Sequence, residues 1–145
     1  MQQDYSNLNL DHQLCFLVYS TNLALNQLYR KLLTPLGLTY PQYLVMLVLW
    51  EKDGLTVSEI GEKLFLESST LTPLLKKLQS NGIVNRERST KDERQVIISL
   101  TAEGHALKLK AVDIPLQVAQ ASACDLDSIT QLKDLLSNLR ENISN

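Results

Sequence analysis

Cysteine, histidine, glycine and proline are all scarce in this sequence. Its 145 residues include two cysteines, two histidines, five glycines and four prolines. So few glycines and prolines argue against a loop-rich or low-complexity chain. Cys15 and Cys124 form no Cys-x-x-Cys pair, and His12 and His105 are expected at the surface, which leaves too few ligands for a structural zinc site. The sequence therefore predicts a globular chain without a metal or a cofactor.

Long apolar runs are also missing. No stretch of about 18 apolar residues occurs, so no membrane-spanning segment is expected. Residues 1–5 are polar and acidic, and they lack the basic and then apolar pattern of a signal peptide. Apolar residues make up 44% of the chain and charged residues 21%, which is ordinary for one compact globular domain. We expect a cytoplasmic protein.

The small net charge of −2 hides an uneven distribution along the chain. Residues 1–68 carry a net charge of −3, residues 69–99 carry +3, and residues 100–145 carry −2. A basic segment inside an acidic chain indicates one surface that faces a polyanion, because phosphate neutralisation needs positive charge only at the contact. A solvated charged face is the simpler alternative, and the local structure of the basic segment decides between the two.

Helical periodicity dominates both ends of the sequence. Apolar residues recur every three or four positions from about residue 10 to residue 33, and an almost uniformly apolar stretch over about residues 41–52 predicts a buried second helix. Near the other end, Thr101 is expected to cap a helix that reaches about residue 110. Ile114 and Pro115 then indicate either a bend or a new helix start, and a last helix begins near Asp125 or Asp127.

Two short helices are expected in the middle of the chain. Thr56 and Glu59 form a Thr-x-x-Glu capping box, which starts a helix that ends near residue 64. The next helix contains Pro73, which suits a first turn because its missing N–H costs little there. This position favours Ser69 or Thr70 as the cap of the second helix.

A β-hairpin follows these two helices directly. Residues 83–88 and 95–100 are rich in β-branched side chains and flank a polar loop over residues 89–94. Two short helices followed by a hairpin with a charged tip predict a winged helix-turn-helix, whose second helix enters the major groove of DNA. A charged helical hairpin beside a two-stranded sheet, without nucleic acid, is the alternative.

The candidate DNA contacts are hydroxyl and basic side chains of the second helix and the hairpin, together with one acidic residue of the loop. Hydroxyls and cations suit phosphates and base edges, and they coincide here with the basic segment. The candidates are Ser68, Ser69, Thr70, Thr72, Lys76, Lys77, Arg86, Arg88, Lys91, Asp92 and Arg94.

The stretch from Leu55 to Leu100 resembles the MarR family of bacterial regulators. The matching segments are Leu-Thr-Val-Ser-Glu-Ile-Gly-Glu-Lys-Leu, Leu-Thr-Pro-Leu-Leu-Lys-Lys-Leu, Asn-Gly-Ile-Val-Asn-Arg and Asp-Glu-Arg-Gln-Val. The resemblance implies a homodimer that binds a pseudo-palindromic operator, with Arg94 in the minor groove and Asp92 orienting it. The implied fold is mainly α with a small β-hairpin wing. In it, a winged helix-turn-helix over about residues 40–111 is carried on dimerisation helices over about residues 8–36 and 112–145.

Cys15 lies on the first predicted helix near several tyrosines. A free cysteine is usually a small buried apolar residue. Tyr19 follows four residues later on the same helical face, Tyr29 points roughly the same way, and Tyr40 begins the next helix. Phenol O–H groups stabilise a thiolate by donating hydrogen bonds to it. The spacing alone leaves both a core cysteine and a sensing cysteine open.

The segments Gln13-Leu14-Cys15-Phe16 and Thr39-Tyr40-Pro41-Gln42-Tyr43-Leu44 resemble one MarR subgroup, the organic-hydroperoxide-resistance repressors. That resemblance implies that organic hydroperoxides oxidise Cys15 and that Tyr29 and Tyr40 of the partner subunit hydrogen-bond to it. It also places Cys124 where two-cysteine members of the subgroup carry a resolving cysteine. An incidental small residue in an exposed loop is the alternative reading of Cys124.

The resulting hypothesis is a repressor, not an enzyme. An organic hydroperoxide would oxidise Cys15, and an intersubunit disulfide with Cys124 would release operator DNA. Two alternatives remain at this point. One is a MarR-type repressor released by a non-covalent phenolic ligand in the dimer cleft. The other is a thiol peroxidase, which would leave the basic helix and the hairpin without a role.

Overall fold

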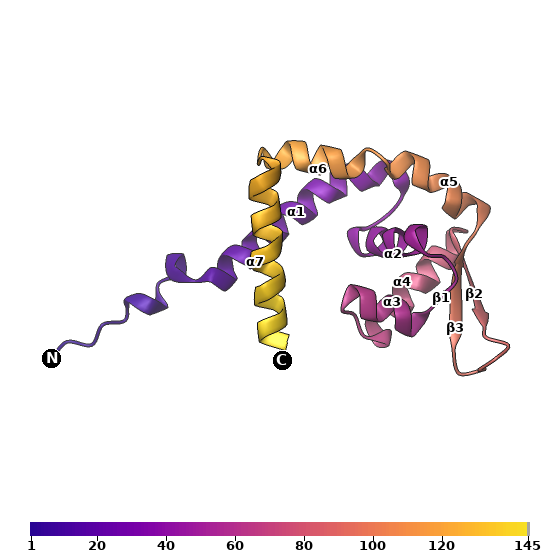
Figure 1. The fold of residues 1–145 in the computed structure, drawn as a ribbon, viewed down its shortest axis with the longest axis horizontal. Coiled ribbons are helices and arrows are strands. Elements are labelled where there is room, and N and C mark those ends of the chain that lie inside the picture. Colours follow the sequence, from indigo (N-terminus) through magenta and orange to yellow (C-terminus); the bar gives the residue numbers. More distant parts are fainter. Residues whose placement is uncertain (145) are drawn as a thin grey trace. The chain divides into compact units, whose positions relative to one another are not determined.

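The computed structural model describes residues 1–144 as a mainly helical chain with one small antiparallel sheet (Figure 1). The predicted fold class is confirmed. The chain forms two compact units, Met1–Val112 and the residues from Asp113 onward. A single chain does not test the predicted boundaries of the dimerisation and DNA-binding regions, which stay predictions.

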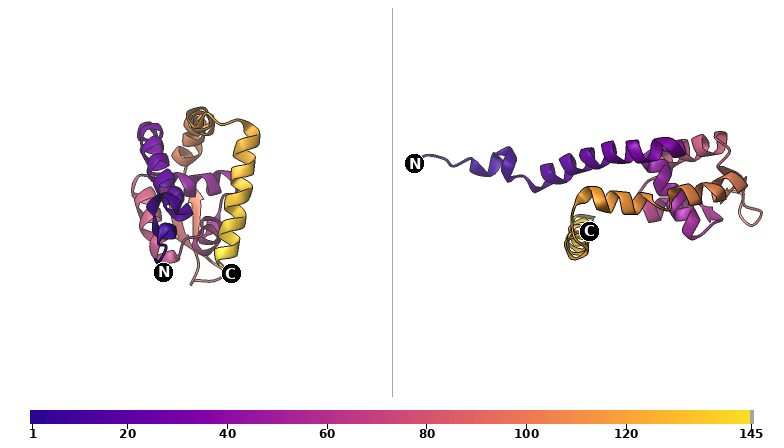
Figure 2. Two further views of the ribbon diagram at one scale, coloured as in Figure 1. Left: turned by 90° about the vertical axis from the view of Figure 1, so that its left-hand side faces the viewer. Right: turned by 90° about the horizontal axis from the view of Figure 1, so that it is seen from above.

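The first long helix, α1 (Leu14–Leu33), begins later than the predicted start near residue 10. Two 3₁₀ turns precede it, η1 (Ser6–Leu8) and η2 (Leu10–His12). Gln13 breaks the helical path because its backbone is extended and its side-chain amide donates to two upstream carbonyls at 2.8 and 2.9 Å. Apolar spacing alone does not reveal such a break. From Leu14, α1 runs as one continuous helix (Figure 2).

The second helix, α2 (Tyr40–Glu51), follows a short 3₁₀ turn, η3 (Thr34–Leu36), and is buried as predicted. Its start is fixed by a capping box that the sequence analysis missed. The N–H of Gln42 donates to Thr39 Oγ1 at 3.4 Å, and the N–H of Thr39 donates to Gln42 Oε1 at 3.0 Å. These bonds satisfy the backbone N–H and the side-chain oxygen of Gln42, which is itself buried.

The helix-turn-helix consists of α3 (Val57–Leu64) and α4 (Ser68–Ser80). The predicted capping box of Thr56 and Glu59 is confirmed. The predicted start of α4 is wrong, because Glu67 occupies the N-cap position and Pro73 lies inside the helix. The Glu67 carbonyl already accepts the N–H groups of Thr70 and Leu71 at 3.0 Å, so the first turn is complete before the proline.

The sheet has three strands in the order β1-β3-β2. The predicted hairpin is confirmed as β2 (Val84–Arg88) and β3 (Val96–Leu100), which pair in antiparallel register. The third strand, β1 (Leu55–Thr56), was not predicted, and it pairs with Ile98 and Ile97 of β3. This pairing attaches the start of α3 to the hairpin.

Helix α5 (Ala102–Ala111) begins at Thr101, as predicted. Thr101 Oγ1 accepts the N–H of Gly104 at 3.1 Å and donates to the Gly82 carbonyl at 2.7 Å. A Cβ on Gly104 would collide with the Ile83 carbonyl oxygen, so α5 packs on the chain before β2 only because this residue is glycine. Trp50 Nε1 donates to the Gly104 carbonyl at 3.0 Å and ties α2 to the same place.

The second unit contains α6 (Ile114–Ser122) and α7 (Leu126–Ser144). The residues Ile114 and Pro115 start a new helix, which settles the alternative that the sequence left open. Asp125 Oδ1 accepts the N–H of Ser128 at 2.7 Å and so caps α7, in agreement with the predicted start. Helix α7 leaves large apolar side chains exposed, among them Leu132, Leu135, Leu136 and Ile143.

Within residues 1–144, no single helix is long and apolar enough to cross a membrane. The bent pair formed by residues 14–36 and α2 meets the length and composition criteria only when the two are taken together. Helix α2 buries Tyr43, Val45, Met46 and Leu49 inside the first unit. A core helix of this kind explains the apolar composition.

Candidate nucleic-acid interface and thiol site

Helix α4 presents one apolar face and one polar face. Leu71, Leu75 and Leu78 are completely buried and hold the helix against the winged domain. Of the predicted contacts, Ser68, Ser69, Thr70, Lys76 and Lys77 are exposed, and Thr72 is half-buried. Hydroxyls and ammonium groups on one open helix face are the donors that DNA phosphates and base edges require.

The turn between α3 and α4 depends on a close backbone approach. The Leu66 N–H donates to the Gly61 carbonyl at 3.0 Å, and a Cβ on Gly61 would lie 2.6 Å from the Leu66 carbonyl oxygen. Glycine at residue 61 therefore lets the chain turn tightly enough to direct α4 outward. Phe65 closes α3 at a φ of +59°, a backbone conformation that bulky residues seldom adopt.

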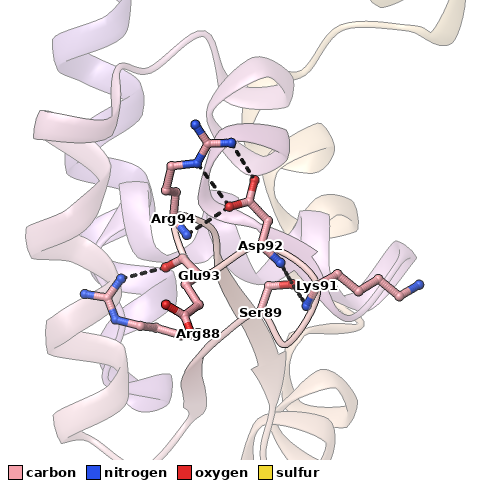
Figure 3. A network of polar contacts seen from close by, with 6 residues as sticks. All are labelled: Arg88, Ser89, Lys91, Asp92, Glu93 and Arg94. Carbon is pink, nitrogen blue, oxygen red and sulfur yellow. Dashed lines mark hydrogen bonds and ion pairs between the residues drawn. The ribbon is translucent and has the colours of Figure 1, made fainter.

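The tip of the hairpin holds Arg94 beside Asp92. Arg94 Nε lies 3.1 Å from Asp92 Oδ1, and Arg94 Nη2 lies 3.3 Å from Oδ2, as Figure 3 shows. The Arg94 side chain is 91% exposed, so the carboxylate orients it without covering it. The hydrogen bonds from Arg94 lower the pKa of the Asp92 carboxyl, which keeps it charged. This geometry agrees with the orienting role expected for Asp92.

Ser89 organises the same loop and was missed in the sequence. It is buried, and its Oγ accepts the N–H groups of Lys91 and Asp92 at 3.2 and 3.3 Å (Figure 3). A serine followed by three polar residues is a typical turn starter, so the Ser89-Thr90-Lys91-Asp92 stretch carries the signal that would have found it. The wing tip is thus a fixed turn, and not a loose loop.

Two of the predicted DNA contacts also brace the wing. Arg88 Nη1 donates to the Glu93 carbonyl at 2.9 Å across the loop. Arg86 is half-buried, and its Nη1 lies 3.5 Å from Oε1 of Gln79 on α4. Its buried Nε has no hydrogen-bond partner among the residues that the structure describes. Arg86 therefore joins β2 to α4, whereas Lys91 and Arg94 remain at the exposed tip.

Three tyrosines gather where α1 meets the start of α2. The ring centroids of Tyr29 and Tyr40 are 4.4 Å apart, and Tyr43, which was not predicted as a site residue, lies 5.8 Å from Tyr29 and 6.3 Å from Tyr40. Tyr19 stands apart from this cluster, and its side chain is 59% exposed. The cluster presents phenol groups from two helices at one place.

Burial keeps these phenols protonated. Burial first, and charge repulsion from the neighbouring Tyr40 and Tyr43 second, together raise the pKa of Tyr29 to about 12. Burial also raises the pKa of Tyr40 and that of Tyr43. Each phenol therefore stays a hydrogen-bond donor at neutral pH, which is the property needed to stabilise an anion such as a thiolate.

Cys15 is the second residue of α1, in its first turn and not in the second turn that the longer predicted helix implied. Its thiol is exposed in the single chain, and no hydrogen bond joins it to a tyrosine of this chain among residues 1–144. The amino end of a helix favours an anionic group, because unpaired N–H groups and the helix dipole point toward it. This factor was not visible while the helix was expected to begin near residue 10.

Cys124 lies in the corner between α6 and α7. Ala123 before it has a φ of +53°, and the Cys124 thiol is exposed and donates to the Ser122 carbonyl at 3.3 Å. Hydrogen bonds from Ser128 lower the pKa of Asp125, so a charged carboxylate follows the thiol in sequence. A thiol that captures an oxidised partner must be accessible, and the exposed Cys124 thiol meets that requirement.

A cleft of about 820 Å³ lies between α1, the start of α2 and α4. Its lining combines the cations of Arg30 and Lys77 with the ring of Tyr40. Amide and hydroxyl side chains complete the lining, among them Asn22, Asn26, Thr34, Thr39 and Asn81. In the part of the chain that the structure describes, no cluster of histidine, cysteine or carboxylate side chains has the arrangement of a metal site.

Comparison with known proteins gives a family match and relatives that are similar along most of the chain. The family described as transcriptional regulator SarA/Rot matches residues 27–110. The organic hydroperoxide resistance transcriptional regulator of Bacillus subtilis (strain 168) is 45% identical over 143 residues, which cover 99% of this chain and 97% of the relative.

Solved structures of similar proteins include complexes with DNA. Reduced AbfR of Staphylococcus epidermidis bound to DNA has a TM-score of 0.81 and 36% identity, with 97% of this chain and 98% of that chain covered. Disulfide-formed AbfR has a TM-score of 0.66 and 39% identity, with 92% and 94% covered. A MarR variant from Escherichia coli complexed with operator DNA has a TM-score of 0.81 and 25% identity, with 94% and 99% covered.

Proposed function

Because this chain belongs to the MarR/SarA family of DNA-binding transcriptional regulators, we propose that it is a dimeric repressor that leaves its operator when an organic hydroperoxide oxidises Cys15. The observation that carries the DNA-binding half is the pairing of an open, hydroxyl- and lysine-bearing face on α4 with the Asp92-braced Arg94 of the wing. The similar AbfR and MarR structures with bound DNA support the same reading.

The dimer is proposed from the exposed apolar faces of α1 and α7. Leu14, Leu17 and Val18 of α1 are exposed, as are Leu132 and Leu135 of α7. A monomeric protein seldom leaves so many large apolar side chains in water, whereas a second copy would cover them. A two-fold dimer would hold two α4 helices about 34 Å apart, which matches successive major grooves on one face of a pseudo-palindromic operator.

The sensing step is proposed at Cys15. Its thiolate would attack the outer oxygen of the hydroperoxide, the O–O bond would break, and the products would be a cysteine sulfenic acid and an alcohol. Donor phenols of Tyr29 and Tyr40 from the partner subunit would stabilise the thiolate before it reacts. The close contact of their rings, which brings two phenol groups to one place, supports this role.

The second step is proposed at the partner's Cys124. Its thiol would attack the sulfenic sulfur, form a disulfide and release water, so that the two steps together consume one hydroperoxide. The bond needs Cα atoms within about 7 Å. Forming it would shift the C-terminal helices and with them the DNA-binding regions. The similarity to AbfR, for which a disulfide-formed structure exists, supports this two-cysteine scheme.

The cleft beside Tyr40 favours a second candidate, a repressor released by a non-covalent phenolic ligand. The cleft offers two cations, an aromatic ring and amides, which suit an aromatic anion. This candidate predicts that a Cys15→Ser variant is still released by its inducer, whereas the hydroperoxide sensor loses its response. We also propose a cytoplasmic location and no catalytic turnover, in keeping with regulators as relatives.

A gel shift with an inverted-repeat operator tests the proposed function. The reduced protein should shift the operator, an organic hydroperoxide should abolish the shift, and a thiol reductant should restore it. Cys15→Ser should bind DNA and ignore the hydroperoxide. Binding that persists after oxidation of the wild type would contradict the sensor. Steady consumption of hydroperoxide with a thiol reductant would indicate a peroxidase instead.

A further inference from the structure

Pro73 stands in the middle of the exposed face of α4. The buried stripe of this helix consists of Leu71, Leu75 and Leu78. At 3.6 residues per turn, the stripe on the opposite side consists of Ser69, Pro73, Lys76 and Ser80, all of which are exposed. The proline therefore lies at the centre of the surface that would face DNA, and not at the edge of the helix or against the core.

An interior proline removes one helical hydrogen bond. Residue 73 has no N–H, so the bond from that position to the Ser69 carbonyl does not form. The pyrrolidine ring also pushes against the carbonyl four residues earlier, which tilts that C=O away from the helix axis. Ser69 itself is exposed. The result is a backbone acceptor, without its usual donor, on the outward stripe of α4.

Groups that only accept hydrogen bonds are rare on this face of α4. The ammonium groups of Lys76 and Lys77 only donate hydrogen bonds. Gln79 Oε1 already accepts from Arg86 Nη1 at 3.5 Å. In the major groove, adenine N6 and cytosine N4 are the donors that a protein must meet with an acceptor. On α4, the exposed hydroxyls and the Ser69 carbonyl can accept a hydrogen bond from these amino groups. A hydroxyl can also donate, whereas the carbonyl can only accept.

We propose that the Ser69 carbonyl, released by Pro73, accepts a hydrogen bond from the exocyclic amino group of an adenine or cytosine in each operator half-site. The inference rests on the DNA-binding half of the proposed function and is independent of peroxide sensing. Ser69 lies in the first turn of α4, and the amino-terminal residues of a recognition helix are the ones that reach base edges. Pro73 is thus a specificity-determining residue that acts through the backbone, at the expense of helix stability.

The first measurement uses base analogues. The reduced wild-type protein selects its preferred duplex from a randomised inverted-repeat library. Each adenine is then replaced by purine, and each cytosine by 2-pyrimidinone, so that one amino group is missing at a time. The loss of one hydrogen bond should weaken binding about fivefold at one position per half-site. If no duplex is enriched, the proposed DNA-binding function itself fails, an outcome separate from failure of the carbonyl contact.

The second measurement couples the analogues to the protein. Pro73→Ala and Pro73→Ser both restore the N–H that donates to the Ser69 carbonyl. The analogue that weakens binding of the wild type should therefore lower the operator affinity of these variants by less than about twofold. Pro115→Ala, at the start of α6 where no helical bond is lost, is the matched control and should behave as the wild type. An analogue penalty that is equal in wild type and in both Pro73 variants would overturn the proposal. The proposal would also be overturned if the Pro73 variants differed from the wild type only in their response to replacement of thymine by uracil. The proline ring would then contact a thymine methyl group.

Discussion

The guanidinium of Arg94 meets the carboxylate of Asp92 at two points, with Nε 3.1 Å from Oδ1 and Nη2 3.3 Å from Oδ2. The Arg94 N–H also donates to Oδ1 at 3.1 Å, so backbone and side chain are held by one oxygen. A two-point contact fixes the plane of the guanidinium as well as its position. An arginine with a fixed plane loses less freedom when it enters a narrow minor groove.

Replacing Arg94 with Ala should weaken operator binding by roughly 1–3 kcal/mol and leave the fold intact, because the lost side chain is exposed. Fluorescence anisotropy with a labelled operator at fixed moderate salt measures the change. Lys133→Ala, which removes one exposed cation of α7, is the matched control and should bind nearly as the wild type. An unchanged affinity of the Arg94 variant would remove the wing from the binding scheme.

The same substitution should raise the pKa of Asp92. In the wild type, hydrogen bonds from Arg94 lower the pKa of Asp92, so its carboxylate stays charged at pH values in and above the ordinary carboxyl range. The ion pair with Arg94 is lost only as the pH falls through the lowered pKa. In Arg94→Ala the Asp92 pKa should return toward its ordinary value. Carbon-13 NMR titration of the side-chain carboxyl follows it, with Asp125, bonded to Ser128, as an internal reference that should not change.

Changing Tyr29 or Tyr40 to Phe should slow the reaction of Cys15 with an organic hydroperoxide by about tenfold or more. A hydrogen bond to a charged group is worth roughly 1.5–3 kcal/mol, and the phenylalanine ring keeps the packing while it removes the donor. Stopped-flow measurement of sulfenic acid formation gives the rate. Tyr5→Phe, an exposed tyrosine outside the cluster, should react as the wild type. Equal rates in all four proteins would sink the role proposed for the phenols.

Cys124→Ser should change reversibility more than initial reactivity. Cys15 should still react, but no disulfide-linked dimer should form, and excess oxidant should convert Cys15 to sulfinic or sulfonic acid. A non-reducing gel and intact-mass spectrometry show both outcomes. Ser122→Ala removes the hydroxyl that accepts the Cys124 N–H and keeps the thiol, so it should still form the dimer.

The oxidised wild type also separates three schemes. A doubled mass on the gel supports the intersubunit disulfide. A monomer that has lost both thiols would indicate a bond within one chain. A monomer with both thiols titratable would contradict the two-cysteine scheme.

Gly104→Ala should destabilise the protein by about 1–3 kcal/mol, because a Cβ would collide with the Ile83 carbonyl, a backbone group that has little room to move. At an open helix position the same change would stabilise by about 0.5–1 kcal/mol, so the sign of the effect reports the contact. Urea unfolding at fixed protein concentration measures it. Glu103→Ala, one residue earlier and exposed, is the control and should stay within about 0.5 kcal/mol of the wild type.

Local signals allowed much of the winged domain to be predicted. The capping box of Thr56 and Glu59 involves residues three apart, and the hairpin strands are separated by a short polar loop. Such features depend on neighbours in sequence and are therefore visible in it. The predicted start of α4 was wrong for a related reason. Pro73 was treated as a first-turn residue, whereas the Glu67 carbonyl accepts the first helical N–H groups and the helix begins at Ser68, five residues before the proline.

Contacts between residues that are far apart in the sequence could not be predicted from it. Strand β1 is two residues long and exists only because Leu55 pairs with Ile98. The ring contact between Tyr29 and Tyr40 depends on the angle at which α1 meets α2, which no periodicity encodes. The support of Arg86 by Gln79 likewise joins a strand to a helix. In each case the residue type can be seen in the sequence, but its contact partner is known only once the chain has folded.

Helix α2 connects the phenol cluster to the far side of the first unit. The Tyr40 ring contacts the Tyr29 ring at one end, and Trp50 donates a hydrogen bond to the Gly104 carbonyl at the other, about 15 Å away at 1.5 Å per residue. Both ends of α2 are held by contacts and its middle is buried, so the helix is expected to be rigid. A displacement of α2 at its tyrosine end would therefore be felt at α5 through Trp50, and strand β3 of the wing leads directly into α5.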